Sequence, residues 1–282
     1  MRVAVVGPGR MGTLLAVAGT RAGWRVVAVA GGSPDARASV AATVAGIRPV
    51  ATPAEAAARA DLVLLTVPDG AIAAVVDELV RADAVGPDQR VVHVAGSLGL
   101  GVLHRAGLAG ARLAACHPAM TVPLGARDSD LLVGVPWGVT AAAADLGWAE
   151  ELVVQLGGDP HRVDDDARGL YHAGLAVASN AVGAAVVTAR RLLLAARIER
   201  PEVFVAPLAT ASVANVAVDG VVALTGPIVR GDVGTVRTHL ERIGADLPEL
   251  LDGYRALARA TLDPVRAGLT AEVVAELDAL LA

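Results

Sequence analysis

The side chains best suited to chemistry stand at the ends of predicted strands. Ser97 closes the segment VAGS, and His117 follows the apolar segment ARLAAC. In a sheet of parallel strands, ligands bind outside the carboxyl ends of the strands. We therefore expect His117 to bind or act on a polar substrate, whereas Ser97 either bonds a substrate oxygen or caps the next helix. His93 lies within its strand and is interpreted as a hydrogen-bonded core histidine.

A second group of polar side chains lies on a long apolar helix, predicted from about residue 165 to 198. Its segment YHAGLAVASN carries His172, Ser179 and Asn180. A spacing of seven residues places His172 and Ser179 about 20° apart around an ideal helix. Polar groups on the inner face of an apolar helix are costly unless they are paired or used. The pattern indicates either a catalytic face, with His172 and Asn180, or polar packing between helices.

The chain contains no lysine, because all 24 of its basic residues are arginine. This excludes Schiff-base chemistry and a lysine general acid. A histidine titrates near neutral pH, so His117 or His172 is expected to donate any proton. No pair of histidines or carboxylates has the spacing of metal ligands, and we expect no metal.

The segment VVGPGRMG, at residues 5–12, predicts a turn that binds a dinucleotide. Gly7 permits a tight turn, Gly9 lets the backbone approach a pyrophosphate, and Gly12 lets the helix pack on the strand. The helix N-terminus adds free N–H groups and a partial positive charge. An ordinary strand–helix turn is the alternative, but the motif lies between a predicted strand and helix, as dinucleotide binding requires.

The end of the second predicted strand favours NADP over NAD. An NAD site usually has an acid there, whereas AVAGGSPDAR has none before Asp35. Ser33 and Arg37 are instead placed to meet a 2′-phosphate, and Asp35 is interpreted as a first-turn helix residue. The residues expected to bind the cofactor are Gly7, Pro8, Gly9, Arg10, Met11, Gly12, Ser33, Arg37, Val67, Pro68 and Asp69.

These residues are carried by strands and helices that alternate up to about residue 163. The pattern is typical of a doubly wound parallel sheet, and only helices are predicted after it. We therefore expect an α/β fold, with a Rossmann domain at residues 1–163 and an all-helical domain at residues 164–282. The predicted strands are 2–6, 24–31, 46–50, 61–70, 90–97, 111–116, 131–141 and 159–164. The predicted C-terminal helices are 165–198, 201–218, 233–243, 247–266 and 270–281.

Composition and charge exclude several classes of protein. The net charge is −5 and no basic stripe runs along the chain, so we expect no nucleic-acid partner. A single cysteine, Cys116, fits a reducing compartment. Met1 and Arg2 lead directly into a strand, so we expect no signal peptide and a cytoplasmic protein.

One segment, from His172 to Ala189, is apolar enough to suggest a membrane span. It carries internal polar residues and is followed by Arg190 and Arg191. A buried helix is therefore expected rather than a span.

Four segments together resemble a bacterial family of Rossmann-like proteins with a C-terminal domain of formerly unknown function. They are GPGRMG, HP at 117–118, YHAGLAVASN at 171–180 and LTGPIVRGD at 224–232. The family is similar in architecture to 6-phosphogluconate dehydrogenase, 3-hydroxyisobutyrate dehydrogenase, ketopantoate reductase and pyrroline-5-carboxylate reductase. In those relatives an all-helical domain, usually dimerising, closes over the nicotinamide. Some members of the family resemble an alternative type of ketopantoate reductase.

The resemblance implies an NADPH-dependent reductase of a small 2-oxo acid, above all 2-dehydropantoate. Hydroxyacid-type relatives usually have a lysine, followed about four residues on by asparagine, near the start of the long helix. This chain has His172 and Asn180 in that region, which favours His172 slightly over His117 as proton donor. The residues expected to hold the substrate are Asn180, Ser97, Asn215 and Arg230.

Two other functions remain open at this point. One is a reductase of cyclic imines of the pyrroline-carboxylate type, and the other is a non-catalytic NADP-binding regulator. An enzyme requires polar groups that converge near the nicotinamide, whereas a regulator would have an apolar or blocked pocket there. In either case we expect a homodimer formed mainly through the helical part, whose apolar surface exceeds what one thin layer can bury.

Overall fold

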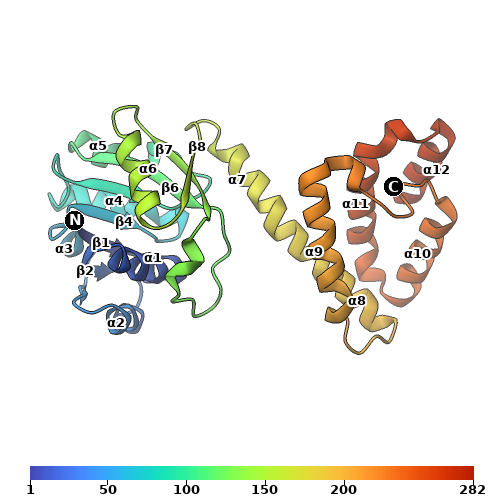
Figure 1. The fold of residues 1–282 in the computed structure, drawn as a ribbon, viewed down its shortest axis with the longest axis horizontal. Helices are drawn as coiled ribbons and strands as arrows, with labels where there is room; N and C mark the ends of the chain where they lie inside the picture. Colours follow the sequence, from blue (N-terminus) through green and yellow to red (C-terminus); the bar gives the residue numbers. More distant parts are fainter. The chain divides into compact units, whose positions relative to one another are not determined.

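A computed structural model describes residues 1–282, which form two compact units, Met1–Ala176 and Val177–Ala282 (Figure 1). The sequence places the boundary near residue 163. In the structure the first unit extends further, through helix α7 (Arg168–Ala176). The start of α7 belongs to the first unit because the Arg168 side chain is buried against the sheet.

The first unit is built on one eight-stranded sheet with the order β3-β2-β1-β4-β5-β6-β7-β8. Its strands are β1 (Arg2–Val6), β2 (Arg25–Ala30), β3 (Arg48–Pro49), β4 (Leu62–Leu65), β5 (Arg90–His93), β6 (Arg112–Pro118), β7 (Pro136–Ala141) and β8 (Asp159–Arg162). All neighbouring strands are parallel except β6 and β7, which pair antiparallel. The doubly wound fold is confirmed, and the sheet is mainly rather than wholly parallel. The exception arises because only a short 3₁₀ helix, η3 (Ser129–Leu132), lies between β6 and β7, without the crossover helix that parallel strands need.

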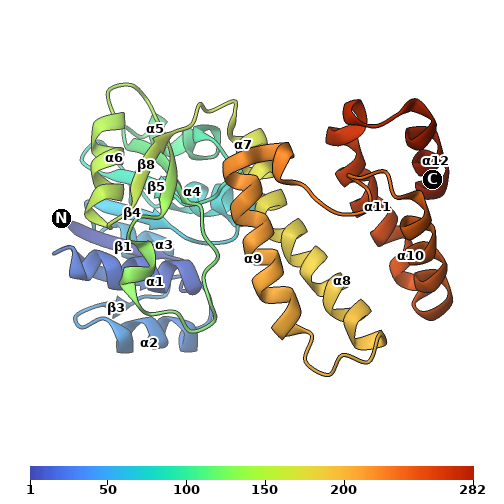
Figure 2. The same ribbon diagram turned by 45° about the vertical axis from the view of Figure 1, so that its right-hand side comes forward.

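Helices cover both faces of this sheet (Figure 2). α1, α2 and α6 pack in one apolar cluster with one face, and α3, α4 and α5 pack in another with the opposite face. The helices are α1 (Arg10–Arg21), α2 (Pro34–Thr43), α3 (Pro53–Ala57), α4 (Ile72–Arg81), α5 (His104–Leu108) and α6 (Leu146–Gln155), with 3₁₀ turns η1 (Asp69–Ala71) and η2 (Leu100–Leu103). This two-sided cover explains why β4 is the uninterrupted apolar run LVLL, every residue of which is buried.

Local signals set the ends of several elements. Thr52 and Glu55 form a capping box at the start of α3, and Ser33 caps α2 by accepting a hydrogen bond from the Ala36 amide. β5 ends at His93, earlier than predicted, because the Ala95 amide donates to the His93 ring instead of to a neighbouring strand.

The second unit is all helical. It begins with a π-helical turn, η4 (Val177–Ala181). Further along are α8 (Val182–Ala195), α9 (Glu202–Asp219), η5 (Gly220–Ala223), α10 (Val233–Asp246), η6 (Pro248–Leu250), α11 (Leu251–Leu262), η7 (Asp263–Gly268) and α12 (Ala271–Leu281). Its buried core contains Ile228, Val236, Leu240, Ala258, Leu262, Leu277 and Leu281. The core therefore comes from α10, α11, α12 and the loop before α10, whereas α8 and α9 contribute no residue to it.

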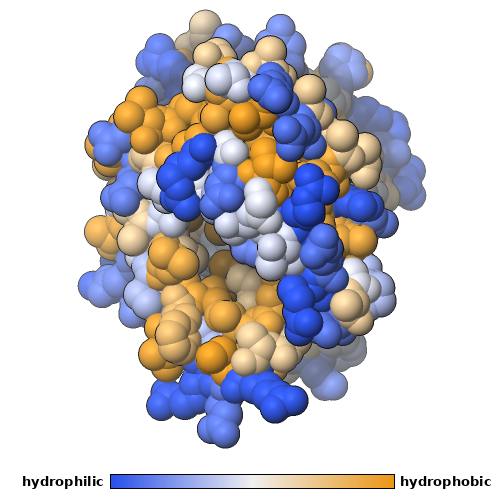
Figure 3. Space-filling view, turned by 90° about the vertical axis from the view of Figure 1, so that its right-hand side faces the viewer, coloured by the Kyte–Doolittle hydropathy of each residue, from blue (hydrophilic) through white to orange (hydrophobic).

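Helices α8 and α9 carry apolar side chains that the chain leaves exposed. Leu208 is 70% exposed and Val222, just after α9, is 90% exposed. By length and composition, Arg168–Ala195 and Glu202–Ala223 are apolar enough to cross a membrane, and 0% and 6% of their most apolar windows are buried. The expectation of a buried helix between His172 and Ala189 is therefore wrong for a single chain. Figure 3 shows broad apolar areas, in orange, among the charged residues of the face that it draws.

Candidate functional site

The glycine turn after β1 has the tight geometry expected of it. Gly7 has a φ of +120°, and a Cβ there would lie 2.5 Å from the carbonyl carbon of Thr66. A Cβ on Gly12 would lie 2.0 Å from the Gly7 oxygen. Glycine is therefore required at both positions, by conformation at the first and by close packing at the second. The Thr66 hydroxyl fixes the turn further by donating to the Gly7 oxygen at 2.7 Å.

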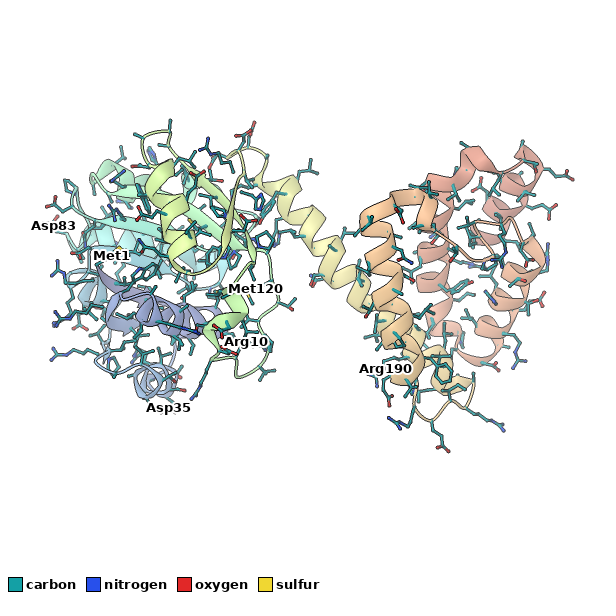
Figure 4. The ribbon with its side chains drawn as sticks, in the orientation of Figure 1. Met1, Arg10, Asp35, Asp83, Met120 and Arg190 are labelled. Carbon is teal, nitrogen blue, oxygen red and sulfur yellow. The ribbon has the colours of Figure 1, made fainter.

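The turn presents open backbone where a phosphate could bind. Gly9 is the N-cap of α1, no side chain caps the helix there, and its first turn carries no acid. No atom lies within 4 Å of the position that a Gly9 Cβ would take. The free N–H groups and the dipole of this helix end suit a pyrophosphate. Arg10 begins the helix, and one of its guanidinium nitrogens lies 3.4 Å from the Val122 carbonyl oxygen (Figure 4).

Ser33 and Arg37 lie together at the end of β2, as predicted. The Arg37 guanidinium donates to the carbonyl oxygens of Gly31, at 3.1 Å, and Gly32, at 2.7 Å. Ser33 caps α2 just beyond this turn, and the first-turn residue Asp35 is exposed. The residues therefore fit a 2′-phosphate, because one cation and one helix N-terminus meet there.

A cluster of two histidines and a tyrosine lies beside the carboxyl ends of β5 and β6. His117 Nδ1 lies 3.0 Å from the Tyr171 hydroxyl, and the rings of His117 and His172 meet edge to face with centroids 5.9 Å apart. A Cβ on Gly96 would lie 2.3 Å from the His172 ring and 3.0 Å from His117 Nε2. The structure thus brings together the two histidines that the sequence places far apart, and only glycine fits between them and β5.

Arg168 lies beneath this cluster as a buried cation without a carboxylate partner. It is 0% exposed and donates to Ala95 O at 2.7 Å and to Thr140 Oγ1 at 2.9 Å. Its Nε has no partner, and its guanidinium carbon lies 5.9 Å from the centroid of the Tyr171 ring. Burial lowers the pKa of Arg168 from its usual value. A buried, unpaired charge is costly, so its position beside polar groups at a sheet edge points to a functional role.

The surroundings keep His117 neutral at pH 7. Burial, above all, and then the positive charge of Arg168 lower the pKa of His117 to about 4. Burial raises the pKa of Tyr171, while the Arg168 charge acts in the opposite direction. His172 makes no hydrogen bond within the chain, so its ring nitrogens are available to a ligand.

The segments that follow β4 and β5 also meet. The Ser97 hydroxyl donates to the Asp69 carboxylate at 3.3 Å, so Ser97 joins two of the predicted site segments. Ser97 does not cap the next helix, because Gly99 holds the N-cap position of η2 and Asp165 accepts from the Leu100 amide at 2.6 Å. Val67 and Pro68 lie in the loop between β4 and Asp69, because β4 ends at Leu65, earlier than the strand predicted at residues 61–70.

His93 is the satisfied core histidine that the sequence predicts. It is fully buried, with Nε2 3.1 Å from Gly99 O and Nδ1 accepting from the Ala95 amide at 3.2 Å. Burial lowers its pKa to about 4.

Three predicted substrate ligands, Asn180, Asn215 and Arg230, belong to the second unit and are exposed there. No hydrogen bond joins any of their side chains to another residue. Ser179 and Asn180 lie in the π turn, so the alignment of His172 with Ser179, which assumes an uninterrupted α-helix, does not apply. These three ligands stay predictions.

Two site residues, Tyr171 and Arg168, were missed at the sequence level. Tyr171 is adjacent to His172 in YHAGLAVASN, but nothing in that segment indicates that its hydroxyl reaches β6. No signal in the sequence marks Arg168, which follows the acidic run of Asp164, Asp165 and Asp166.

Comparisons with known families divide the chain into two parts. Residues 1–118 match the family described as Rossmann-like domain, and residues 135–261 match the Domain of unknown function (DUF2520). None of the curated proteins compared with the chain matches its sequence.

Solved structures share the fold over nearly the whole chain. A protein of Bacteroides fragilis described as a candidate NADP oxidoreductase has a TM-score of 0.79 at 23% identity, over 93% of this chain and 98% of that chain. An imine reductase of Myxococcus stipitatus, in complex with NADP⁺, has a TM-score of 0.64 at 19% identity, over 95% and 93%. A pyrroline carboxylate reductase of Plasmodium falciparum, with NADP bound, has a TM-score of 0.58 at 13% identity, over 100% and 98%. At these identities the similarity establishes the fold.

Proposed function

We propose that the chain is an NADPH-dependent reductase whose chemistry takes place at the carboxyl edge of the sheet in the first unit. One observation carries this proposal. The glycine turn after β1 and the cluster of His117, Tyr171 and His172 lie at the same edge of one sheet. Ligands of doubly wound sheets bind along that edge. The NADP-bound enzymes among the similar structures support the same cofactor.

Each part of the cofactor has residues suited to it. The amides at the start of α1 would hold the pyrophosphate, and Ser33 and Arg37 would hold the 2′-phosphate. The residues Val67, Pro68 and Asp69 line the neighbouring strand end. NADPH, when bound, supplies a hydride to an electrophilic carbon.

Where the substrate is a carbonyl compound, the proton in this proposal comes from Tyr171. A histidine that is neutral at pH 7 is a poor general acid, and the low pKa of His117 places it in that class. The Nδ1–H tautomer of His117 would donate to the phenol oxygen at the observed 3.0 Å and leave the phenol proton free to move to the substrate. The phenolate left behind would be stabilised by that N–H and by the Arg168 cation.

His172 has a separate role in this scheme. Its ring nitrogens are free of partners, so it would hydrogen-bond the substrate next to Tyr171. The sequence-based expectation that His172 or His117 donates the proton is the rival account. Substitution of Tyr171 separates the two.

The preferred substrate class is a small cyclic imine. Asp69 places an exposed carboxylate at the edge beside Ser97, and a protonated imine would be attracted to it, whereas the carboxylate of a 2-oxo acid would be repelled. The similar structures include an imine reductase and a pyrroline carboxylate reductase.

A 2-oxo acid such as 2-dehydropantoate is the second candidate. Reduction of a carbonyl leaves an alkoxide that must gain a proton, and the paired Tyr171 and His117 would supply it. A protonated imine needs no such donor.

Consumption of NADPH, followed by its absorbance, tests the proposal against a matched panel of cyclic imines and 2-oxo acids. We expect turnover with cyclic imines that are protonated at neutral pH. Turnover of 2-oxo acids but not of cyclic imines would make a 2-oxo acid the preferred substrate class. Tight NADPH binding without turnover of any member would favour the non-catalytic regulator.

We also propose that two copies of the chain associate through α8 and α9. The exposed apolar residues of these helices support this proposal, because contact of apolar side chains with water is unfavourable. A membrane span is disfavoured, because Arg190 and Arg191 lie within α8 and charged residues are costly in a lipid-facing helix. Light scattering at micromolar concentration should give the mass of a dimer. Val213→Asp with Leu208→Asp, on α9, should give the monomer, whereas a monomeric wild-type protein would contradict the proposal.

A further inference from the structure

We propose that the amino edge of the sheet in the first unit holds a second anion site, suited to a small molecule with two or more linked phosphate groups. The site does not depend on the proposed reductase activity. It rests on how arginines are distributed along this edge.

Five strands of the sheet begin with an arginine. These residues are Arg2, Arg25, Arg48, Arg90 and Arg112, at the starts of β1, β2, β3, β5 and β6. Because these strands are all parallel, their first residues lie toward one edge. Arg2 is opposite Arg25 and Arg90 is opposite Arg112, whereas Arg48 is opposite Ala28, three residues further along β2 than Arg25. The edge therefore concentrates positive charge in a chain whose net charge is −5.

In the half of this edge formed by β5 and β6, the chain supplies its own partners. Arg112 Nε donates to Asp145 at 2.5 Å. Arg90 and Arg112 also lie over the Trp148 ring, at 5.3 and 5.6 Å from its centroid. Arg112 is thus ion-paired, and both guanidinium groups make a cation–π contact with Trp148.

In the half of the edge formed by β1, β2 and β3, most arginines have no carboxylate partner. Arg2 pairs with Asp61 at 2.5 Å, but Arg25, Arg48 and Arg59 have no carboxylate within 4.0 Å. Arg2 and Arg25 are also direct neighbours in the register of β1 and β2. Like charges on adjacent strands repel, so an anion from outside the chain would stabilise this half of the edge.

These arginines surround a hollow large enough for such a ligand. Arg2, Arg25, Arg48 and Arg59 line a cavity of about 480 Å³, and no acidic residue lines it. Small-molecule sites usually have volumes of about 300–1,000 Å³. A planar guanidinium group can donate two hydrogen bonds to a pair of phosphate oxygens. Three guanidinium groups without a carboxylate partner can donate more hydrogen bonds than the two oxygens of a single carboxylate can accept. The chemistry therefore selects a di- or triphosphate group.

The hollow is separate from the cofactor turn. Arg2 begins β1, and the glycine turn follows its other end. At about 3.3 Å per residue, a five-residue strand separates the two by about 16 Å. Figure 4 shows Met1 and Arg10 at opposite ends of this strand. Both sites can then be occupied together.

Calorimetric titration of the full chain with sodium tripolyphosphate, in the presence of saturating NADPH, tests the proposal. The wild-type protein should bind one equivalent, with an affinity that falls as salt is added. Arg25→Gln with Arg48→Gln should weaken binding at least tenfold, while NADPH affinity and the circular dichroism spectrum stay unchanged. The matched control is Arg105→Gln, an exposed arginine of the same unit that pairs with Asp77, and it should bind like the wild type.

Three outcomes would overturn the proposal. The first is unchanged tripolyphosphate affinity in the double variant. The second is equal weakening by Arg105→Gln, which would indicate diffuse attraction to the surface. The third is loss of the binding when NADPH saturates the protein, which would place the anion at the cofactor turn. Because catalysis is not measured, none of these outcomes bears on the proposed reductase.

Discussion

Each unit of the chain contains a histidine–tyrosine pair, and the two pairs have nearly the same geometry. The rings of His117 and Tyr171 have centroids 5.8 Å apart at 87°, and those of His239 and Tyr254 are 5.9 Å apart at 88°. The Nδ1 to hydroxyl distance is 3.0 Å in the first pair and 2.7 Å in the second. The internal geometry of the pairs therefore does not distinguish them.

The surroundings of the two histidine–tyrosine pairs do distinguish them. His239 and Tyr254 join α10 to α11 and line a hollow of about 350 Å³ in which no charged residue takes part. The first pair lies at the end of a strand, beside Gly96 and above the buried cation of Arg168. A histidine–tyrosine hydrogen bond can simply hold two helices together. An unpaired charge beside it, at the ligand-binding edge of a sheet, makes it a candidate for proton transfer.

The largest expected difference between the pairs is in turnover. Tyr171→Phe removes the proposed proton donor and should lower kcat for a 2-oxo acid substrate by about 10²–10⁴-fold. Tyr254→Phe removes the equivalent hydroxyl from the second pair and should leave kcat within a few fold. Steady-state kinetics on both variants, with NADPH affinity as the control for folding, makes the comparison.

A contrary result would locate the donor elsewhere. If Tyr171→Phe keeps full activity while His172→Ala loses it, the donor is His172, as the sequence-based account favours. If neither variant slows turnover tenfold, the proton comes from water.

The buried histidines of the first unit should make its stability depend on pH. His93 has a pKa of about 4 in the folded chain, against 6.5 for an ordinary histidine. The unfolded chain therefore binds more protons between these values, and stability is complete above about pH 6.5 and falls as the pH is lowered toward 4. The loss from His93 should be on the order of 3 kcal/mol. Urea unfolding at pH 7 and pH 4.5 measures it.

A variant identifies the source of this pH dependence. His93→Gln should be less stable than the wild type at pH 7 and should show a smaller loss of stability on acidification. If the free energy of unfolding depends on pH in the same way in the variant and the wild type, His93 is excluded as the cause.

Cofactor choice should depend on Arg37, which lies in the first unit. Arg37→Ala removes a charge-assisted contact and should weaken NADPH binding by about 1.5–3 kcal/mol, with little change for NADH. Arg190→Ala, an exposed arginine of the second unit, is the matched control. Equal affinities of the wild-type protein for NADPH and NADH would contradict the assignment of NADPH.

The smallest expected effect is a change in the pKa of His117. The positive charge of Arg168 contributes to the low pKa of His117, although burial contributes more. Arg168→Met should therefore raise the pKa of His117 toward its usual value, and NMR titration of the histidine ring protons would detect it. NMR signals from the second unit serve as an internal control and should be the same as in the wild type. An unchanged His117 pKa would show that burial alone sets it.

The fold was predictable because its signals are local. The glycine turn, the buried run LVLL and the capping box of Thr52 with Glu55 each depend on residues close in sequence. The antiparallel β7 was not predicted, because an apolar strand pattern does not encode its direction. The extension of the first unit into α7 was missed for a similar reason, since it depends on where one arginine packs.

The candidate site was predictable only in part. Strand-end position pointed to His117 and Ser97, and the absence of an acid after the second strand pointed to Ser33 and Arg37. Tyr171 and Arg168 depend on contacts across more than 50 residues of sequence, to β6 and its neighbours, which no local pattern specifies. The excess of apolar surface in the helical part was predicted, but the sequence does not specify that α8 and α9 carry it, because their composition is that of a buried helix.

Deuterium transfer is the most direct test of the reductase assignment. NADPH carrying deuterium at the transferable position would be incubated with the wild-type protein and each cyclic imine or 2-oxo acid of the panel, and the products analysed by mass spectrometry. The account predicts a product that carries the deuterium at the former imine or carbonyl carbon. If the substrate is a 2-oxo acid, the Tyr171→Phe variant should form this product far more slowly than the Tyr254→Phe variant. Tight binding of NADPH with no deuterium in any product would contradict it.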